Sequence, residues 1–481
     1  MATLVLLRCW FDFCHDARLV CYVDLTLAVI QGAIMRLVSV LLALFAVTFT
    51  IDSVAAAKPN IIFILADDMG YGDLGCYGHP VAKTPVLDAL AKQGARFTQH
   101  YANGPECSPT RTAFLTGRYQ QLAGGLECAI GTGNVGRYDD AIRLANQREL
   151  GLPAEQSVIP RDLKAVGYQC AVFGKWHLGY EPKFNPMHHG WHRFFGYLGG
   201  NVHYFNHRET SDLHVLFEGK LPVYRDGYMT HLITDASLQF IEQNKDRPFF
   251  LYVSHECPHF PFQGPKDSKK VVTSENWMEA DQKTYVAMLE DLNAEVGRLL
   301  KKLDELKLAE NTLVIFVSDN GGYGRAANMG PLSGAKSTTL EGGIRVPLII
   351  RWPGHIKPGT TSNQACITFD LTASIMRIAG TETAQQRLDG IDIIDHVVKG
   401  QKDKKRTLFW RGKRGTRTWW AARDGDLKYV RKTEDDKTQE WLFDLTDDIS
   451  EKHNLLNAQP KNAERLRSLL SKWEVDVKAL R

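Results

Sequence analysis

Two uninterrupted apolar runs stand out along the chain, and polar residues follow each of them at once. The first begins at Asn60 and reads NIIFILADD, and the second begins at Asn311 and reads NTLVIFVSDNGG. Continuous apolar runs of this length are typical of strands that are buried on both faces, as in a parallel sheet covered by helices. Shorter apolar runs predict further strands at 170–173, 248–254 and 347–350.

A long helix is predicted just before the second run. Between Met278 and Leu306 the apolar residues recur every three or four positions, which places them on one face of a helix. Helices that alternate with apolar strands predict a doubly wound α/β sheet. We therefore expect an α/β domain over residues 58–385, in which helices flank the sheet.

The C-terminal part follows a different pattern. Arg417 to Ala422 and Leu427 to Arg431 flank an Asp-Gly-Asp turn and predict a β-hairpin, and EWLFDL from Glu440 predicts another strand. A closing amphipathic helix places apolar side chains on one face, at Leu466, Leu469, Leu470, Trp473 and Val477. The pattern predicts a smaller α+β domain over residues 386–481.

The first 57 residues have the order of a targeting segment. Met35 and Arg36 precede an uncharged run from Leu37 to Ile51, and small residues follow up to Ala57. This order is that of a secretory signal peptide, and the run is shorter than the roughly 20 residues that span a bilayer. We expect residues 1–57 to form a leader that contains the signal peptide. Its true translation start is expected at Met35, and cleavage near Ala57 would leave no stable membrane anchor.

Composition narrows the class of protein and its compartment. The 481 residues carry 58 Lys and Arg against 55 Asp and Glu, so the sequence shows no charge excess that would predict nucleic-acid binding. The chain lacks any Asn-x-Ser/Thr glycosylation acceptor, which argues against a eukaryotic secretory origin. We expect an exported protein, periplasmic or secreted, of bacterial origin.

Hard oxygen ligands follow both long apolar runs. Asp67 and Asp68 come directly after the first, and Asp319 and Asn320 come directly after the second. Ligands of open α/β sheets bind outside the carboxyl ends of the strands, so these four side chains can meet at one site. Carboxylate and amide oxygens suit Ca²⁺ or Mg²⁺ better than Zn²⁺. Either pair alone can also be a turn or a helix N-cap.

A cysteine stands at a predicted helix start. In Cys107-Ser108-Pro109-Thr110-Arg111, the proline suits the first turn of a helix. The helix dipole there favours anions and is expected to lower the pKa of the Cys107 thiol. Arg111, one turn further on, could bind an oxyanion. Taken alone, the cysteine could equally be a buried structural residue.

These segments together resemble the sulfatase family. Cys107 to Arg111 matches the family's CxPxR core, and the paired aspartates in NIIFILADD match its first strand. GYQCAVFGKWHLG, SDNGG and GAKSTTLEGGIRVP match further family motifs in the same order. The resemblance covers nearly all of residues 58–481. It implies an alkaline-phosphatase-like mixed sheet and hydrolysis of a sulfate ester by S–O cleavage.

The resemblance also implies a modified residue and a metal ion. In the family the cysteine of the core motif is oxidised to formylglycine by a maturation enzyme, and the hydrated aldehyde is the nucleophile. Position 107 would then bind one divalent cation, usually Ca²⁺ and less often Mg²⁺. The other expected ligands are Asp67, Asp68, Asp319 and Asn320.

The remaining family roles fall on five residues. Arg111 and Lys175 would hold the formylglycine hydrate. His177 would be the base that expels sulfate and regenerates the aldehyde. Lys336 and His259 would bind the sulfate and protonate the leaving alcohol. The family's histidine stands shortly before a proline, which favours His259 in the segment SHECPHFPF, and His255 of the same segment stays open as an alternative.

Two other functions stay open beside the sulfatase function. A phosphonate or phosphate ester hydrolase could use the same scaffold, and a relative without activity could bind glycans. The expected substrate is a sulfated small molecule or polysaccharide. The segments 124–145 and 202–228 are expected to set its specificity, because binding residues concentrate on loops.

Overall fold

The computed structural model describes residues 33, 35, 58–124, 127–131, 139–381 and 388–478. The chain divides into two compact units, Met1–Ala57 and Lys58–Arg481, and the second contains all the strands named below. The predicted leader, with its cleavage near Ala57, and the predicted boundary at residue 385 lie outside the described residues and stay predictions. Within the described ranges, no helix has both the length and the apolar character that crossing a membrane requires.

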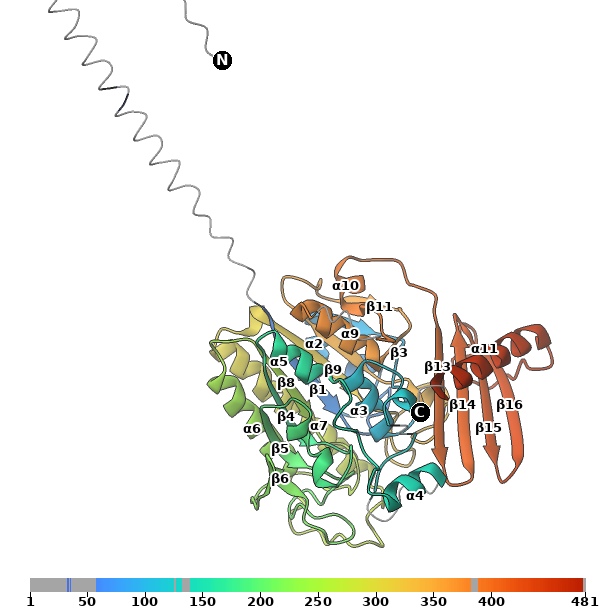
Figure 1. Cartoon of the computed structure of the whole chain (residues 1–481), viewed down its shortest axis with the longest axis horizontal. Coiled ribbons are helices and arrows are strands. Elements are labelled where there is room, and N and C mark those ends of the chain that lie inside the picture. Colours follow the sequence, from blue (N-terminus) through green and yellow to red (C-terminus); the bar gives the residue numbers. More distant parts are fainter. Residues whose placement is uncertain are drawn as a thin grey trace, which may run out of the picture. The chain divides into compact units, whose positions relative to one another are not determined.

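A ten-stranded mixed sheet forms the centre of this unit, as the sequence predicts (Figure 1). Its strand order is β11-β2-β10-β9-β1-β8-β4-β5-β6-β7. The five strands from β9 to β5 in this order are parallel, whereas β10 pairs with β9 in the antiparallel direction. The strands are β1 (Asn60–Ala66), β2 (Ala95–Phe97), β4 (Gln169–Lys175), β5 (Arg193–Tyr197), β6 (Leu216–Glu218), β7 (Leu221–Pro222), β8 (Phe249–Ser254), β9 (Thr312–Ser318), β10 (Leu348–Arg351) and β11 (Thr360–Ser362).

Helices cover both faces of the sheet, which explains the continuous apolar runs. Alternate residues of β1 enter two different cores: Ile62 and Ile64 pack with α2, α6 and α7, whereas Ile61 and Phe63 pack with α3, α5, α9 and α10. Every residue of β1 is therefore buried. The helices are α2 (Pro85–Gln93), α3 (Cys107–Thr116), α4 (Asp139–Asn146), α5 (Ile159–Ala165), α6 (Met229–Gln243), α7 (Gln282–Glu305), α8 (Glu341–Ile344), α9 (Thr368–Ala379) and α10 (Ile393–Val398).

A four-stranded antiparallel sheet with one long helix forms the C-terminal part (Figure 1). The predicted hairpin is β14 (Arg417–Asp424) and β15 (Leu427–Glu434), and the predicted helix is α11 (Pro460–Lys478). The sequence analysis missed β13 (Thr407–Arg414), which carries the buried Arg411 among its apolar residues and so lacks a clean alternation. The other strands are β16 (Lys437–Asp444) and the small pair β3 (His100–Tyr101) and β12 (Cys366–Ile367).

A buried ion group connects this sheet to the larger one. Lys428 of β15 lies 2.7 Å from Glu341, the first residue of α8, and 2.9 Å from Glu451. The side chains of all three are fully buried. Because α8 follows directly on the loop that carries Lys336, the C-terminal sheet helps to hold that loop in place.

Candidate active site

The polar residues that follow β1 and β9 meet at one edge of the sheet. The two strands are parallel neighbours with Ala66 opposite Ser318, so the residues that follow them are brought side by side. The Asp68 amide donates to Asp319 Oδ1 at 3.2 Å, and Asn320 Nδ2 donates to Asp68 Oδ1 at 2.7 Å. Asp67, like these three residues, is fully buried.

Three cations balance the three carboxylates. Lys175, the last residue of β4, donates to Asp67 Oδ2, and Lys336 Nζ lies 2.7 Å from Asp68 Oδ2. Arg111 contacts Asp319 Oδ2 through Nε at 3.0 Å and through a terminal nitrogen at 2.8 Å. A buried charge is tolerated only when it is paired, so each of these ions depends on the others.

The carboxyl groups respond to this setting in different ways. Burial, followed by the charge of Asp319, raises the pKa of Asp67 to about 7, and burial also raises the pKa of Asp68. Asp319 is equally buried, but Arg111 and Lys175 hold its pKa below the ordinary value. Asp67 and Asp68 therefore bind a proton more readily than exposed aspartates do, because burial outweighs the effect of the lysines that pair with them.

Cys107 is the first residue of α3, as the sequence predicts. Its Sγ lies 3.4 Å from Asp67 Oδ1 and 3.8 Å from Lys336 Nζ. The expected lowering of the thiol pKa is wrong, because burial and then the charge of Asp67 raise it well above the ordinary value. The helix N-terminus does not offset the loss of water around the sulfur.

The structure brings His259, and not His255, into this cluster. His259 Nε2 lies 3.0 Å from Lys336 Nζ and 3.4 Å from Asp68 Oδ2. Its Nδ1 lies 2.6 Å from the Phe260 carbonyl oxygen, so that nitrogen carries the ring proton and Nε2 is the acceptor. The His255 ring is fully buried, and within the described part of the chain neither of its nitrogens has a hydrogen-bond partner.

His177 lies on the loop after β4, in a left-handed conformation with φ of 57°. Its Nε2 lies 2.6 Å from the Ile130 carbonyl oxygen, which makes Nε2 the donor, and its Nδ1 has no hydrogen-bond partner among the described residues. Burial, with the charges of Lys175 and Arg111, holds the pKa of His177 well below its ordinary value. The ring is therefore neutral at neutral pH.

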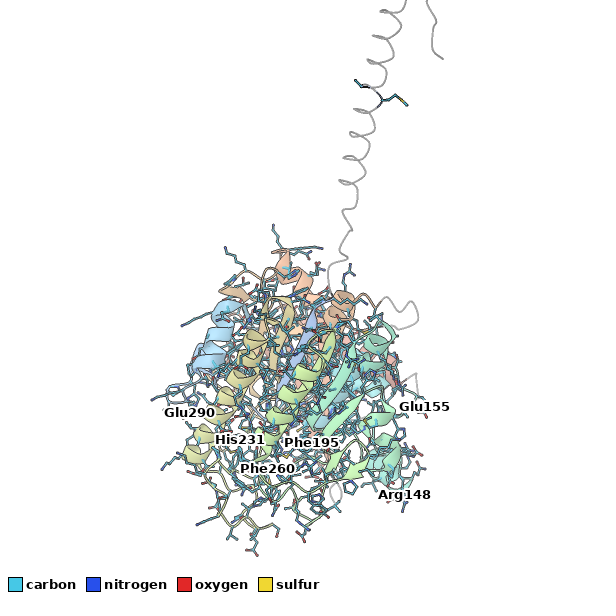
Figure 2. All side chains as sticks on the ribbon, turned by 90° about the vertical axis from the view of Figure 1, so that its left-hand side faces the viewer. Arg148, Glu155, Phe195, His231, Phe260 and Glu290 are labelled. Carbon is cyan, nitrogen blue, oxygen red and sulfur yellow. The ribbon has the colours of Figure 1, made fainter. Side chains whose placement is uncertain are left out.

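A cavity of about 560 Å³ opens onto these groups. Cys107, His177, His259 and Lys336 line it on the side of the sheet. Phe260, which also lines it, is labelled in the lower half of the view in Figure 2. The remaining walls combine small and polar residues with some aromatic and charged side chains, among them Tyr180, Trp277, Tyr323, Glu209 and Arg414. The reactive groups thus lie where an ester of moderate size can reach them.

Comparisons with known proteins agree with this arrangement. The family profile described as "Sulfatase" matches residues 59–381, about two thirds of the chain. The chain belongs to the sulfatase family. A second profile, described as "N-sulphoglucosamine sulphohydrolase, C-terminal", matches residues 335–476.

Curated relatives support the same assignment for this sulfatase. It is 34% identical to N-acetylgalactosamine-6-sulfatase of Sus scrofa over 406 residues, which cover 78% of this chain and 72% of the relative. It is 35% identical to arylsulfatase A of Homo sapiens over 382 residues, 74% of this chain and 71% of the relative. The protein is accordingly a sulfuric ester hydrolase.

Solved structures share its fold. The crystal structure of Ps i-CgsB in complex with k-i-k-neocarrahexaose superposes with a TM-score of 0.75 at 29% identity, covering 86% of this chain and 92% of the other. The phosphonate monoester hydrolase of Agrobacterium radiobacter gives a TM-score of 0.63 at 19% identity, over 88% and 96% of the two chains. The second likeness shows a common fold. The predicted α/β architecture, a mixed sheet flanked by helices with a smaller C-terminal part, is thereby confirmed.

The residues of this sulfatase offer a suitable setting for a divalent cation. One ligand atom from each of Asp67, Asp68, Cys107 and His259 lies within 4.8 Å of all the others. The buried Oδ1 of Asn320 also has no hydrogen-bond partner among the described residues. The sequence predicts Asp319 and Asn320 as ligands beside Asp67, Asp68 and position 107, and this ligand set stays a prediction. In the structure Oδ2 of Asp319 pairs with Arg111, and Oδ1 accepts the Asp68 amide hydrogen bond.

Sequence reasoning missed two serines of this site. Ser254, the last residue of β8, accepts from Arg111 at 2.5 Å and donates to the Lys175 carbonyl at 2.7 Å. Ser108 donates to the His177 carbonyl at 2.8 Å. Ser254 could have been found, because it ends a buried strand at the same sheet edge as the aspartates. Ser108 carries no comparable signal.

The close approach of Gly200 to His177 gives the first prediction. A Cβ at position 200 would lie 2.8 Å from His177 Nε2, so Gly200→Ala has to displace the ring. If His177 is the base that the sequence predicts, we expect kcat to fall about 10- to 100-fold, because small misplacements of a reacting group are costly. Steady-state kinetics on a sulfate ester will measure the loss.

Gly264→Ala is the matched control. Its Cβ would meet only ordinary contacts, at 3.5 Å from Asp267 and 3.6 Å from Ala287. Equal activity of the two variants would contradict the role of Gly200.

Proposed function

We propose that this sulfatase removes sulfate from a sulfated carbohydrate, with a formylglycine formed from Cys107 as its nucleophile. The observation that carries the proposal is the position of Cys107. Its sulfur lies between the Asp67 carboxylate and the Lys336 ammonium, at the wall of a cavity that His177, His259 and Lys336 also line.

The setting of the thiol favours a modified residue over a free cysteine. A thiol with a raised pKa stays protonated and is a poor nucleophile at neutral pH. Formylglycine, in its hydrated form, supplies a hydroxyl group that can attack sulfur. The proposal therefore includes the predicted partner, a maturation enzyme that oxidises Cys107 before or during export.

Lys175 and Arg111 are proposed to hold the group at position 107. The Asp67 carboxylate contacts both Lys175 and Cys107. Its Oδ2 accepts a hydrogen bond from Lys175 Nζ, and its Oδ1 lies nearest to the Cys107 sulfur. Arg111 is fixed by Asp319 and Ser254, and a terminal nitrogen lies 3.7 Å from Asp67. Cations that are held in place before the reaction stabilise negative charge without reorganising.

His177 is proposed to accept the proton that leaves the hydroxyl group at position 107 when sulfate is expelled. Its Nδ1 is the unprotonated nitrogen, because Nε2 faces the Ile130 carbonyl. The lowered pKa keeps the ring neutral and able to accept a proton at neutral pH. Ser108 fixes the backbone of His177 and so keeps the ring orientation.

Lys336 and His259 are proposed to bind the sulfate and to deliver a proton to the leaving alcohol. Lys336 Nζ donates toward His259 Nε2, so a proton can pass between them. An alkoxide would leave poorly without such a donor. His255 does not line the cavity in the described structure, which favours His259 for this role.

Ca²⁺ is the proposed cation, held by the group at position 107 with Asp67, Asp68, Asp319 and Asn320. A hard divalent cation would polarise the sulfate oxygens. Its fit rests on three buried carboxylates and the amide oxygen of Asn320, which has no hydrogen-bond partner among the described residues. An all-oxygen set supplied mostly by protein is more typical of Ca²⁺ than of Mg²⁺, which keeps several waters.

A carbohydrate is favoured as the carrier of the sulfate. The relatives include an N-acetylgalactosamine-6-sulfatase, and Ps i-CgsB was crystallised with a neocarrahexaose. The cavity combines aromatic walls with polar groups, which suits a sugar ring. The phosphonate or phosphate alternative is not favoured, because its relative supports the fold alone. Export, a periplasmic or secreted location and a bacterial origin stay part of the proposal.

Release of inorganic sulfate tests the proposed chemistry. The full chain, co-produced with a maturation enzyme, is expected to release sulfate from sulfated oligosaccharides. Cys107→Ala, which removes the nucleophile, should lose activity by at least about 10⁴-fold, the order found for removed nucleophiles. Faster release of phosphonate than of sulfate from matched aryl esters would contradict the assignment.

Metal removal tests the proposed cation. Treatment with EGTA is expected to abolish sulfate release, and Ca²⁺ should restore it at lower concentration than Mg²⁺. Binding to the folded state also stabilises it, so the melting temperature should rise with added Ca²⁺. Asn320→Ala should weaken this rise, whereas Asn363→Ala, on the loop after β11, should leave it unchanged. Full activity in EGTA would contradict the cation site.

A further inference from the structure

A buried carboxylate lies directly before the proposed nucleophile, and the proposed chemistry does not use it. Glu106 is the N-cap residue of α3 and has an extended backbone. The residue is 3% exposed, and its side chain makes no capping hydrogen bond to α3. The carboxylate is bound instead by three other segments of the chain. Two of these carry or orient a proposed reacting group, and the third is the C-terminal sheet.

The first segment is the loop that carries Lys336. The next residue, Ser337, donates from its hydroxyl to Glu106 Oε1 at 3.0 Å and from its amide to the Pro105 carbonyl at 2.8 Å. Ser337 has a left-handed backbone with φ of 73°, which is uncommon for a residue other than glycine. Hydrogen bonds to two successive residues therefore fix the loop beside Lys336 against the segment that leads into Cys107.

The second segment orients the proposed base. Ala129 donates from its amide to Glu106 Oε2 at 2.6 Å. The next residue, Ile130, has its carbonyl oxygen 2.6 Å from His177 Nε2, and this contact sets which ring nitrogen stays unprotonated. The position of Glu106 is thus transmitted to His177 through two neighbouring residues of one loop.

The third segment is β13 of the C-terminal sheet. Arg414, its last residue, contacts Glu106 Oε1 through Nε at 2.8 Å and Oε2 through a terminal nitrogen at 3.3 Å. Although burial alone would raise it, Arg414 holds the pKa of Glu106 below the ordinary value, so the pair is ionic. The strand itself is held in place nearby, because Arg411 Nε donates to Glu127 at 2.5 Å and the Lys413 amide donates to the Glu127 carbonyl at 3.1 Å.

From these contacts, and resting on the proposed function, we infer that Glu106 and Arg414 are positioning residues of the reaction. Glu106 holds position 107, the Lys336 loop and the loop that orients His177 in one arrangement, and Arg414 holds Glu106. The C-terminal sheet therefore contributes to catalysis without touching the reacting atoms. Arg414 also lines the cavity, so the test has to distinguish positioning from a direct contact with substrate.

Arg414→Gln tests this inference, because it removes the ion pair and leaves the sequence around Cys107 intact. Sulfate release from a sulfated oligosaccharide is measured, and each rate is divided by the fraction of residue 107 that is aldehyde. We expect kcat to fall about tenfold and KM to change less than about twofold, since misplaced groups slow the chemical step. Arg414→Lys, which keeps the charge and one contact, should recover part of the loss.

Arg417→Gln is the matched control. Arg417 lies opposite Arg414 in the pairing of β13 with β14, and it pairs with the partly exposed Glu434 at 3.7 Å. Its kcat should equal that of the wild type. Glu106→Gln should lose at least as much activity as Arg414→Gln, and the double variant should lose no more than Glu106→Gln alone, because residues that act as a unit are not additive.

The outcomes separate the inference from the proposed function. A rise in KM at constant kcat would make Arg414 a substrate contact and overturn the inference. Losses that multiply in the double variant, or an equal loss in Arg417→Gln, would also overturn it, while the sulfatase function would stand. A matured wild type that releases no sulfate from the oligosaccharide would overturn the proposed function, and the inference with it. Melting curves check the fold of each variant, and Arg414→Lys decides by the same criteria should Arg414→Gln not fold.

Discussion

The site depends on the mutual compensation of buried ions at the carboxyl edge of the sheet. Asp67, Asp68 and Asp319 are fully buried, and each is paired with a cation from a different part of the chain. Charges in such a place are stable only together, so the fold has to deliver all of them at once. The parallel register of β1, β8, β9 and β4 brings the three aspartates and Lys175 to one edge, and α3 and the loop before α8 add Arg111 and Lys336.

The same constraint explains why the cluster suits a cation and an anionic substrate. Burial and the Asp319 charge raise the pKa of Asp67 to about 7, so the ionised carboxylate is costly here even beside its cation partners. A divalent cation would stabilise the ionised carboxylates and add positive charge that attracts a sulfate ester. The C-terminal sheet helps to position Lys336. Lys428 of this sheet forms buried ion pairs with Glu341 and Glu451, and Glu341 begins α8, next to the loop that carries Lys336.

Much of this arrangement could be predicted from the sequence, because its signals are local. The buried strands were visible as apolar runs, and their terminal aspartates pointed to one edge. The sequence favoured His259 over His255 but could not decide between them, since that depends on the path of the loop after β8. It also gave the wrong direction for the Cys107 pKa, because burial is a tertiary property. Arg414 carries no motif, and only folding brings it to Glu106.

The identity of residue 107 in active protein tests the central claim most directly. Trypsin releases this residue in the peptide Phe97 to Arg111, whose mass distinguishes a thiol from an aldehyde. The measurement should be made on protein from the native host, together with its rate of sulfate release. The account predicts that activity rises in proportion to the aldehyde form. A fully active protein that carries only the cysteine thiol would contradict it.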